Sequence, residues 1–303
     1  MKALFFTGAG GVGNEAVFRL LKRKYNIIFG DAVPENINKI IPKKNIRKIP
    51  FANQNNFVNE IKKIYKDDNI DLIIPAVDEE LEILADQKMN IFLPDKNFIK
   101  NMISKDVFVE TLKENGISYP KTGKVDFDWL DYPCILKPKK GRGSRGVEII
   151  KSRDKLKSYL EYTGLNQEEY ILQELLNGQE YTILMSANKN NKLLGINLVK
   201  VKEKKGITIS AETSINKSIL KFCKDFHKKI PTRGCYNIQL IHCNDGKIVP
   251  FEVNPRISTT LCLAIYSGID PIENFYKKNN IKLSIGNKSL YLKRFYINNI
   301  GEI

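Results

Sequence analysis

The sequence contains so few histidines that no side-chain nucleophile is obvious. Its 303 residues include two histidines, one tryptophan and five cysteines. The cysteines are odd in number and scattered without a C-x-x-C spacing, at Cys134, Cys223, Cys235, Cys243 and Cys262. This arrangement argues against a disulfide framework and predicts buried thiols in a reducing compartment. A zinc site is also disfavoured, because Cys235, His242 and Cys243 have no fourth ligand at the usual spacing.

Long hydrophobic runs are absent as well. No apolar segment is long enough to cross a bilayer, and Met1 and Lys2 lead directly into a short apolar stretch followed by glycines. We therefore expect neither a membrane span nor a secretory signal, and we expect a cytoplasmic protein. The length and the hydrophobic fraction of 42% are enough for two domains with their own cores.

Acidic residues are outnumbered by basic ones. The chain has 34 Asp and Glu against 49 Lys and Arg, a net charge of +15. A charge of this size often indicates nucleic-acid binding. Here the excess is nearly all lysine, spread from end to end beside abundant isoleucine and asparagine. We expect a solvated basic surface and affinity for phosphorylated small molecules, and we do not expect nucleic acid as a partner.

The first hundred residues alternate between strand and helix patterns. Strands are expected at residues 3–6, 26–29 and 71–75, and helices at residues 14–23, 57–65 and 79–85. This alternation predicts an α/β fold with a parallel, doubly wound sheet, a Rossmann-like domain over residues 1–94. Asp78, directly after the third strand, is expected to cap the following helix, with substrate contact as an alternative.

A glycine-rich turn follows the first expected strand. Gly8 to Gly13 match G-x-G-x-x-G, and Asp31 ends the second strand 18 residues later. Taken alone, this fingerprint predicts a dinucleotide site and leaves an NAD-dependent oxidoreductase open as a function. The competing interpretation is a tight turn whose glycines allow close packing.

A second glycine-rich segment begins at Lys137, where a short strand ends. The sequence K-P-K-K-G-R-G-S-R-G-V occupies residues 137–147. Its three glycines in six residues predict a mobile loop whose N–H groups approach phosphate, with Lys137 as a point charge. No G-K-[ST] follows, so the loop is not a Walker A motif. A flexible hairpin tip remains the alternative.

The most informative stretch is a polar hairpin. Residues 244–246 (N-D-G) predict a tight turn between two strands. Glu252 and Asn254 share one face of the return strand, and Gln239 on the paired strand can join them. Oxygen ligands of this kind suit Mg²⁺ held between protein and nucleotide phosphates, and Arg256 is left to meet an anion. A hairpin that only solvates its polar face is the alternative.

Four motifs in a fixed order resemble the ATP-grasp superfamily over residues 94–268. They are S-K-D at 104–106, the loop at 137–147, Q-E-L-L-N-G-Q-E-Y-T at 173–182 and P-F-E-V-N-P-R-I-S at 250–258. The chain is similar to the large subunit of carbamoyl phosphate synthetase and to stand-alone carboxylate–amine ligases. The resemblance implies that residues 1–94 form a pre-ATP-grasp domain that does not bind nucleotide. A two-lobed α+β ATP-grasp domain would follow over residues 95–303, with an ATP lid lobe at 95–175 and a metal and substrate lobe at 176–303.

The resemblance also implies roles for single residues. ATP would be bound by Lys105, Lys137, Ser144, Gln173, Glu174, Leu176 and Glu180. Mg²⁺, or alternatively Mn²⁺, would be held by Gln239, Glu252 and Asn254. Arg256 and Lys137 would be the catalytic residues that neutralise the transferring phosphate.

The implied function is a Mg²⁺-dependent ligase that joins a small-molecule carboxylate to an amine. It would form an amide or peptide bond through an acyl-phosphate and release ADP and phosphate. An NAD-dependent oxidoreductase and an ATP-binding module without catalysis are the alternatives. The resemblance also makes a homodimer possible.

Overall fold

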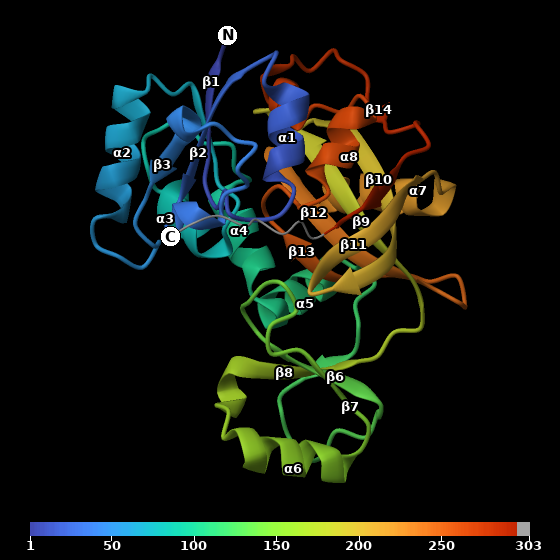
Figure 1. The fold of residues 1–303 in the computed structure, drawn as a ribbon. Helices are drawn as coiled ribbons and strands as arrows, with labels where there is room; N and C mark the ends of the chain where they lie inside the picture. Colours follow the sequence, from blue (N-terminus) through green and yellow to red (C-terminus); the bar gives the residue numbers. More distant parts are fainter. Residues whose placement is uncertain (296–303) are drawn as a thin grey trace.

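A computed structural model describes residues 1–295, which form three β-sheets with helices around them (Figure 1). The N-terminal sheet is parallel, in the order β3-β2-β1-β4. Its strands are β1 (Ala3–Phe6), β2 (Asn26–Asp31), β3 (Ile46–Lys48) and β4 (Leu72–Ile74). The accompanying helices are α1 (Asn14–Leu21), α2 (Phe57–Asp67), α3 (Asp78–Ala85) and the 3₁₀ turns η1 (Pro34–Asn36) and η2 (Lys43–Asn45). Sequence analysis missed β3, because three half-exposed residues carry no readable period.

The largest sheet follows in the second half of the chain, in the order β13-β12-β9-β10-β11-β15. Its strands are β9 (Gly178–Ala187), β10 (Leu193–Lys205), β11 (Ile207–Ser214), β12 (Gly234–Cys243), β13 (Ile248–Asn254) and β15 (Tyr291–Lys293), with β14 (Ser284–Ile285) parallel to β10. All its other pairings are antiparallel. The predicted hairpin is β12 and β13.

Alternating side chains give this large sheet two buried faces. Met185 and Tyr236 pack with the helices α4 (Lys96–Ile103), α5 (Lys105–Glu114) and α7 (Lys217–Lys229). Leu184 and Cys235, one residue away on each strand, join the core of the N-terminal sheet together with α8 (Leu261–Tyr266) and α9 (Pro271–Tyr276). Because successive strand residues face opposite sides, one sheet can serve both cores.

A small antiparallel sheet lies apart from the other two, at the bottom of Figure 1. Its order is β5-β8-β6-β7, from β5 (Thr122–Gly123), β6 (Cys134–Pro138), β7 (Glu148–Ile150) and β8 (Tyr170–Glu174). The helix α6 (Arg153–Thr163) covers its outer face through Leu156 and Leu160, and η3 (Gln167–Glu169) leads into β8. The other face of the small sheet points toward the large sheet, so the two sheets can enclose a ligand.

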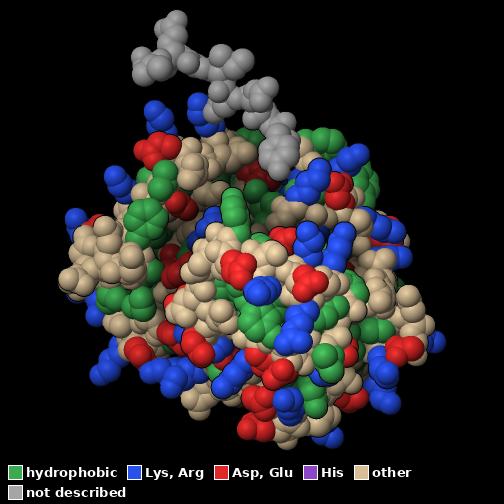
Figure 2. Space-filling view, turned by 90° about the horizontal axis from the view of Figure 1, so that it is seen from below, with side chains coloured by type: hydrophobic (Ala, Val, Ile, Leu, Met, Phe, Trp, Pro, Cys, Tyr) green, Lys and Arg blue, Asp and Glu red, His purple; other side chains and the backbone are tan. Residues whose placement is uncertain are grey.

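The predicted α/β fold class is confirmed: a parallel sheet comes first, and sheets whose pairings are almost all antiparallel follow. The cysteines are free, and four of the five are buried. Within residues 1–295, no three His, Cys, Asp or Glu side chains gather as a metal site, and no helix is long and apolar enough to span a membrane. Figure 2 shows Lys and Arg side chains interspersed with Asp and Glu over one face rather than gathered in a patch.

Candidate active site

A cavity of about 320 Å³, the inter-lobe cavity, lies between the small and the large sheet. Its walls come from β6, β8, β13 and the glycine-rich loop after β6. Every residue that the sequence predicted for ATP lines it, namely Lys105, Lys137, Ser144, Gln173, Glu174, Leu176 and Glu180. Glu252 lines it too. Residues far apart in the sequence therefore meet at one place.

Lys137 is buried at the back of the inter-lobe cavity. Its Nζ donates to Gln173 Oε1 at 2.7 Å and to the Phe251 carbonyl at 3.3 Å. Burial lowers the pKa of Lys137 to about 7; Glu252 opposes this, and the neighbouring Lys105 and Lys204 ammonium groups add to it. The amine is therefore poised between its neutral and charged forms and would gain a proton beside an anion.

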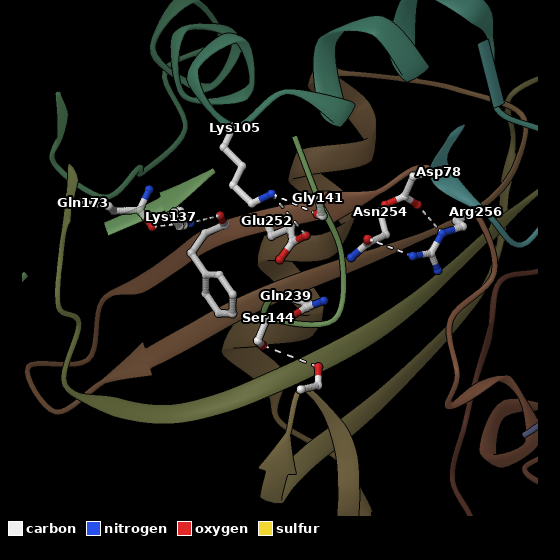
Figure 3. A network of polar contacts seen from close by, with 12 residues as sticks. Asp78, Lys105, Lys137, Gly141, Ser144, Gln173, Gln239, Glu252, Asn254 and Arg256 are labelled. Atoms are coloured by element: carbon white, nitrogen blue, oxygen red, sulfur yellow. Dashed lines mark hydrogen bonds and ion pairs between the residues drawn. The ribbon is translucent and has the colours of Figure 1, made fainter. Parts of the chain in front are cut away.

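Lys105 reaches the cavity from the first turn of α5 (Figure 3). Its Nζ lies 3.8 Å from Glu252 Oε1 and donates to the Gly141 carbonyl at 3.2 Å. The side chain is almost fully buried. One ammonium group thus connects the hairpin carboxylate to the start of the glycine-rich loop.

The glycine-rich loop crosses over to the turn between β10 and β11. Ser144 has a left-handed backbone with φ of 56°, and its Oγ lies 3.5 Å from the Gly206 carbonyl. A Cβ on Gly206 would meet the Gly143 carbonyl oxygen at 2.8 Å, so this approach requires glycine. The loop therefore covers the cavity, as a lid would.

Gln173 and Glu174 use their side chains to build the wall of the cavity. Gln173 accepts from Lys137 and donates to Thr122 Oγ1 at 2.9 Å. Glu174 Oε1 accepts from the Lys121 N–H at 2.7 Å. Gln173 is also paired through its backbone with both β5 and β6, and the Glu174 N–H donates to the Lys121 carbonyl at 2.9 Å, so both residues are held firmly in the wall.

The predicted metal residues lie on one face of the β12–β13 hairpin. Gln239 is directly opposite Glu252, and Asn237 is directly opposite Asn254. These four and Arg256 line a cavity of about 100 Å³, the hairpin cavity. The strand alternation therefore placed these side chains correctly.

Lys204 is a site residue that sequence analysis missed. Its Nζ lies 2.7 Å from Glu180 Oε1 and 3.2 Å from Gln239 Oε1, and it lines both the inter-lobe and the hairpin cavity. Register shifts in β10 after Val201 and Glu203 change which side chains face inward. Alternation read from the sequence cannot anticipate such bulges.

The donor set fits a divalent cation that arrives with a nucleotide. Carboxylate and amide oxygens are ligands for Mg²⁺, and Gln239, Glu252 and Asn254 supply them. Of these three, only Glu252 carries a charge. The Lys105 ammonium group lies beside Glu252, and the Lys204 ammonium group lies beside Gln239. The protein oxygens alone would bind a free cation weakly, so phosphate oxygens would have to complete the site.

Arg256 follows β13 and is held from two sides (Figure 3). Its Nε donates to Asp78 Oδ1, and its two terminal nitrogens donate to the Ile257 carbonyl at 3.0 Å and to Asn254 Oδ1 at 3.5 Å. The prediction that Asp78 caps α3 was wrong. Val77 occupies the cap position, and the Asp78 carboxylate turns to the guanidinium, its stronger partner.

A cleft of about 730 Å³, the N-terminal cleft, separates the strand ends of the N-terminal sheet from the loop after β13. The glycine-rich turn at Gly8–Gly13 forms part of its wall, but three consecutive N–H groups of the turn already have acceptors within the protein. Those of Ala9, Gly10 and Gly11 donate to the Gly30 carbonyl at 3.1 Å, Asp31 Oδ2 at 2.7 Å and the Gly8 carbonyl at 3.0 Å. The Asp31 carboxylate thus takes the Gly10 N–H that a pyrophosphate would need, so a pyrophosphate is disfavoured at this turn.

Glu80 is buried at the floor of the N-terminal cleft. Its carboxylate accepts from the Thr7 hydroxyl, but burial and the nearby Asp31 and Glu79 raise its pKa to about 8. The folded state therefore binds the proton more tightly than the unfolded chain. The contribution of Glu80 to the free energy of unfolding is fully present below about pH 4.5, where the carboxyl is protonated in both states. It is lost as the pH rises toward about 8.

Glu80→Gln should therefore stabilise the protein near neutral pH. The amide keeps an acceptor for Thr7 without a charge, so we expect a gain of about 2 kcal/mol at pH 7 that shrinks toward pH 4.5. Thermal melts across this range would measure it, with Glu212→Gln on the surface as the control. Equal stability curves for wild type and variant would contradict a neutral, buried Glu80.

Comparison with known proteins agrees with the geometry. The ATP-grasp domain profile matches residues 103–260, more than half of the chain. The chain belongs to the ATP-grasp family. This family consists of enzymes that form carbon–nitrogen bonds, so the predicted family and enzyme class are confirmed.

Curated relatives of this ATP-grasp chain carry ligase and synthase names. It is 25% identical over 232 residues to the tyramine–L-glutamate ligase of Methanocaldococcus jannaschii. The matched region covers 74% of this chain and 68% of that protein. It is 27% identical over 176 residues to the carbamoyl phosphate synthase large chain of Clostridium beijerinckii, covering 52% of this chain but only 16% of the relative. A D-alanine–D-alanine ligase of Petrotoga mobilis is 33% identical over 98 residues, 31% of this chain and 33% of the relative.

Solved structures share the fold at low sequence identity. The biotin carboxylase domain of the Hydrogenobacter thermophilus 2-oxoglutarate carboxylase, solved with MgADP and bicarbonate, matches with a TM-score of 0.69 and 14% identity over 93% of this chain and 71% of that one. The L-amino acid ligase of Bacillus licheniformis matches with a TM-score of 0.66 and 15% identity over 88% of this chain and 70% of that one. These likenesses confirm the ATP-grasp fold, and the oxidoreductase alternative is not favoured.

Proposed function

We propose that this protein is an ATP-dependent ligase that joins a carboxylate to an amine through an acyl-phosphate and releases ADP and phosphate. The observation that carries the proposal is the continuity of the site. Glu252 lines both the inter-lobe and the hairpin cavity, and Arg256 lines both the hairpin cavity and the N-terminal cleft. A phosphoryl group near Glu252 would therefore meet a carboxylate entering from the cleft.

In the first step a carboxylate oxygen of the substrate attacks the γ-phosphorus, and the bond from that phosphorus to ADP breaks. Lys105 and Lys137 would bind the phosphate oxygens, and Arg256 would neutralise the charge that develops on the side of the cleft. Positioning and charge neutralisation supply most of the catalysis in phosphoryl transfer. A bound Mg²⁺, held by Gln239, Glu252 and Asn254, would add charge neutralisation between the phosphates.

In the second step the amine attacks the acyl carbon, phosphate leaves, and the amine loses a proton. Water would compete for the same carbon, so the site must be closed during the step. The glycine-rich loop, with Ser144 against Gly206 and Lys105 bound to Gly141, is already in a covering position. We assign the loop the role of lid.

The N-terminal cleft fits substrates of the amino-acid or peptide type. It combines basic side chains, from Arg142, Arg145, Lys205 and Arg256, with acidic ones, from Asp31 and Glu79. A substrate that carries both a carboxylate and an ammonium group could be bound at both ends. The ligase names of the relatives support the same substrate class.

We also propose that the chain divides at residues 94/95 and 175/176. The first boundary precedes α4, and the second falls between β8 and β9. On this division the first domain would supply the cleft and the following two lobes would supply the nucleotide and metal sites. α4 and α5 belong by sequence to the first lobe, yet they pack on the large sheet.

The test is MgATP turnover, followed as ADP release against pooled amino acids, short peptides and simple amines. We expect release that requires both a carboxylate and an amine. If omission of the amine alone abolishes ADP release, the acyl-phosphate formed in the first step is not discharged until the amine attacks it. Binding of NADH without binding of ATP would refute the proposal, and tight ATP binding without turnover in every pool would favour the non-catalytic module.

A further inference from the structure

We infer that Asp78 is a positioning residue for Arg256, through which the N-terminal domain orients the group that meets the transferring phosphate. This inference rests on the proposed function. Asp78 is the first residue of α3, on the N-terminal side of the cleft, and Arg256 follows β13 on the other side. The two side chains are only 15% and 12% exposed, which makes their contact an unusually sheltered ion pair.

The geometry leaves the working edge of the guanidinium available. Asp78 Oδ1 accepts from Nε alone, while the terminal nitrogens point to the Ile257 carbonyl and to Asn254 Oδ1. The contact at 3.5 Å to Asn254 is weak, so a terminal nitrogen can move to a phosphate oxygen at little cost. A planar guanidinium fixed at Nε has its remaining N–H groups fixed in direction.

The neighbours of Asp78 on α3 make different contacts, which separates its role from theirs. Glu79 Oε2 lies 3.4 Å from Arg142 Nε of the glycine-rich loop, and Glu80 turns inward to Thr7. Arg142 also lines the hairpin cavity, but it belongs to the glycine-rich loop; of these three carboxylates, Asp78 is the one that contacts the arginine at the end of β13. Because the pair crosses the cleft, it would tie the orientation of Arg256 to the position of the domain that holds the acceptor.

The test uses the full chain and a probe that needs no substrate. MgADP with aluminium fluoride mimics the transferring phosphoryl group, and calorimetry measures its binding separately from that of MgADP alone. We expect Asp78→Asn to weaken the fluoroaluminate complex about 10- to 100-fold, since a misplaced group costs this much, and to leave MgADP affinity unchanged. Asp86→Asn, in a surface ion pair with Lys96 at the other end of α3, is the control.

A double-mutant cycle distinguishes positioning from a structural role. If Asp78 acts through Arg256, Asp78→Asn should cause no further loss in the Arg256→Gln background. An equal loss in both backgrounds would overturn the inference, as would tighter fluoroaluminate binding by Asp78→Asn, which would make Asp78 a competitor for Arg256. If Asp78→Asn does not fold, Arg256→Lys removes the Nε contact from the other side, and unchanged fluoroaluminate binding there would overturn the inference.

The same experiment separates the two proposals. A wild-type chain that binds no MgADP would refute the proposed function and the inference with it. A wild-type chain that binds MgADP and the fluoroaluminate complex, with Asp78→Asn indistinguishable from it, would refute the inference alone.

Discussion

Glu252→Gln should lower ADP release by at least about 10²- to 10³-fold at saturating MgATP. Glu252 is the single charged member of the proposed ligand set, opposite Gln239 in the hairpin, and it lies 3.8 Å from the Lys105 ammonium group. The substitution would leave three amides and two lysines around the cation. The measurement is steady-state ADP release with a substrate pair that turns over, across a Mg²⁺ titration.

The metal dependence makes the reason for this loss testable. With a weakened site, we expect the variant to need more Mg²⁺ for half-maximal rate and to recover partly with Mn²⁺, which binds such ligands more tightly. Glu212→Gln, a surface carboxylate paired with Lys202 at 2.8 Å, is the matched control and should retain full activity. A Glu252→Gln enzyme with wild-type rates and an unchanged Mg²⁺ requirement would remove the hairpin from the proposed metal site.

The parts of the fold and site that could be predicted depend on short-range patterns. Strand alternation put Glu252 and Asn254 on one face, and the N-D-G turn fixed the strand opposite, so Gln239 followed. The nucleotide residues were assigned through the family resemblance, and all of them line one cavity. Their individual roles remain proposals.

What could not be predicted depends on distant contacts and on irregular strands. Asp78 has the local features of a helix cap, and its partner Arg256 lies 178 residues away. Lys204 faces the site because of bulges in β10, which leave no trace in the residue pattern. The glycine fingerprint suggested a dinucleotide, but Asp31 accepts from Gly10 and Val33 and so closes the turn on itself. The decisive features are a distant partner for Asp78, strand bulges for Lys204 and an internal hydrogen bond for Asp31.

Lys137→Met should abolish measurable ADP release while leaving the chain folded. Burial lowers the pKa of Lys137 from 10.5 to about 7, so the folded state disfavours its charge. Above about pH 10.5 the amine is neutral in both the folded and the unfolded chain, and Lys137 does not lower the free energy of unfolding. As the pH falls to about 7, that free energy decreases, because the unfolded chain takes up the proton more readily than the folded one. Removal of the amine abolishes this decrease but leaves Gln173 Oε1 without its donor, so we expect the variant to be more stable at pH 7 by about 1–3 kcal/mol.

Nucleotide binding supplies the decisive measurement for the same residue. At about pH 8 the free amine is mostly neutral, and phosphate oxygens beside it would raise its pKa, so MgATP binding should take up close to about one proton. At about pH 6 the amine is already charged and the uptake should vanish. Calorimetry in two buffers of different ionisation enthalpy measures the proton count. Lys137→Met should remove the uptake at pH 8, whereas Lys155→Met on α6 should retain it. A proton count that is the same at both pH values would contradict a contact between Lys137 and the phosphates.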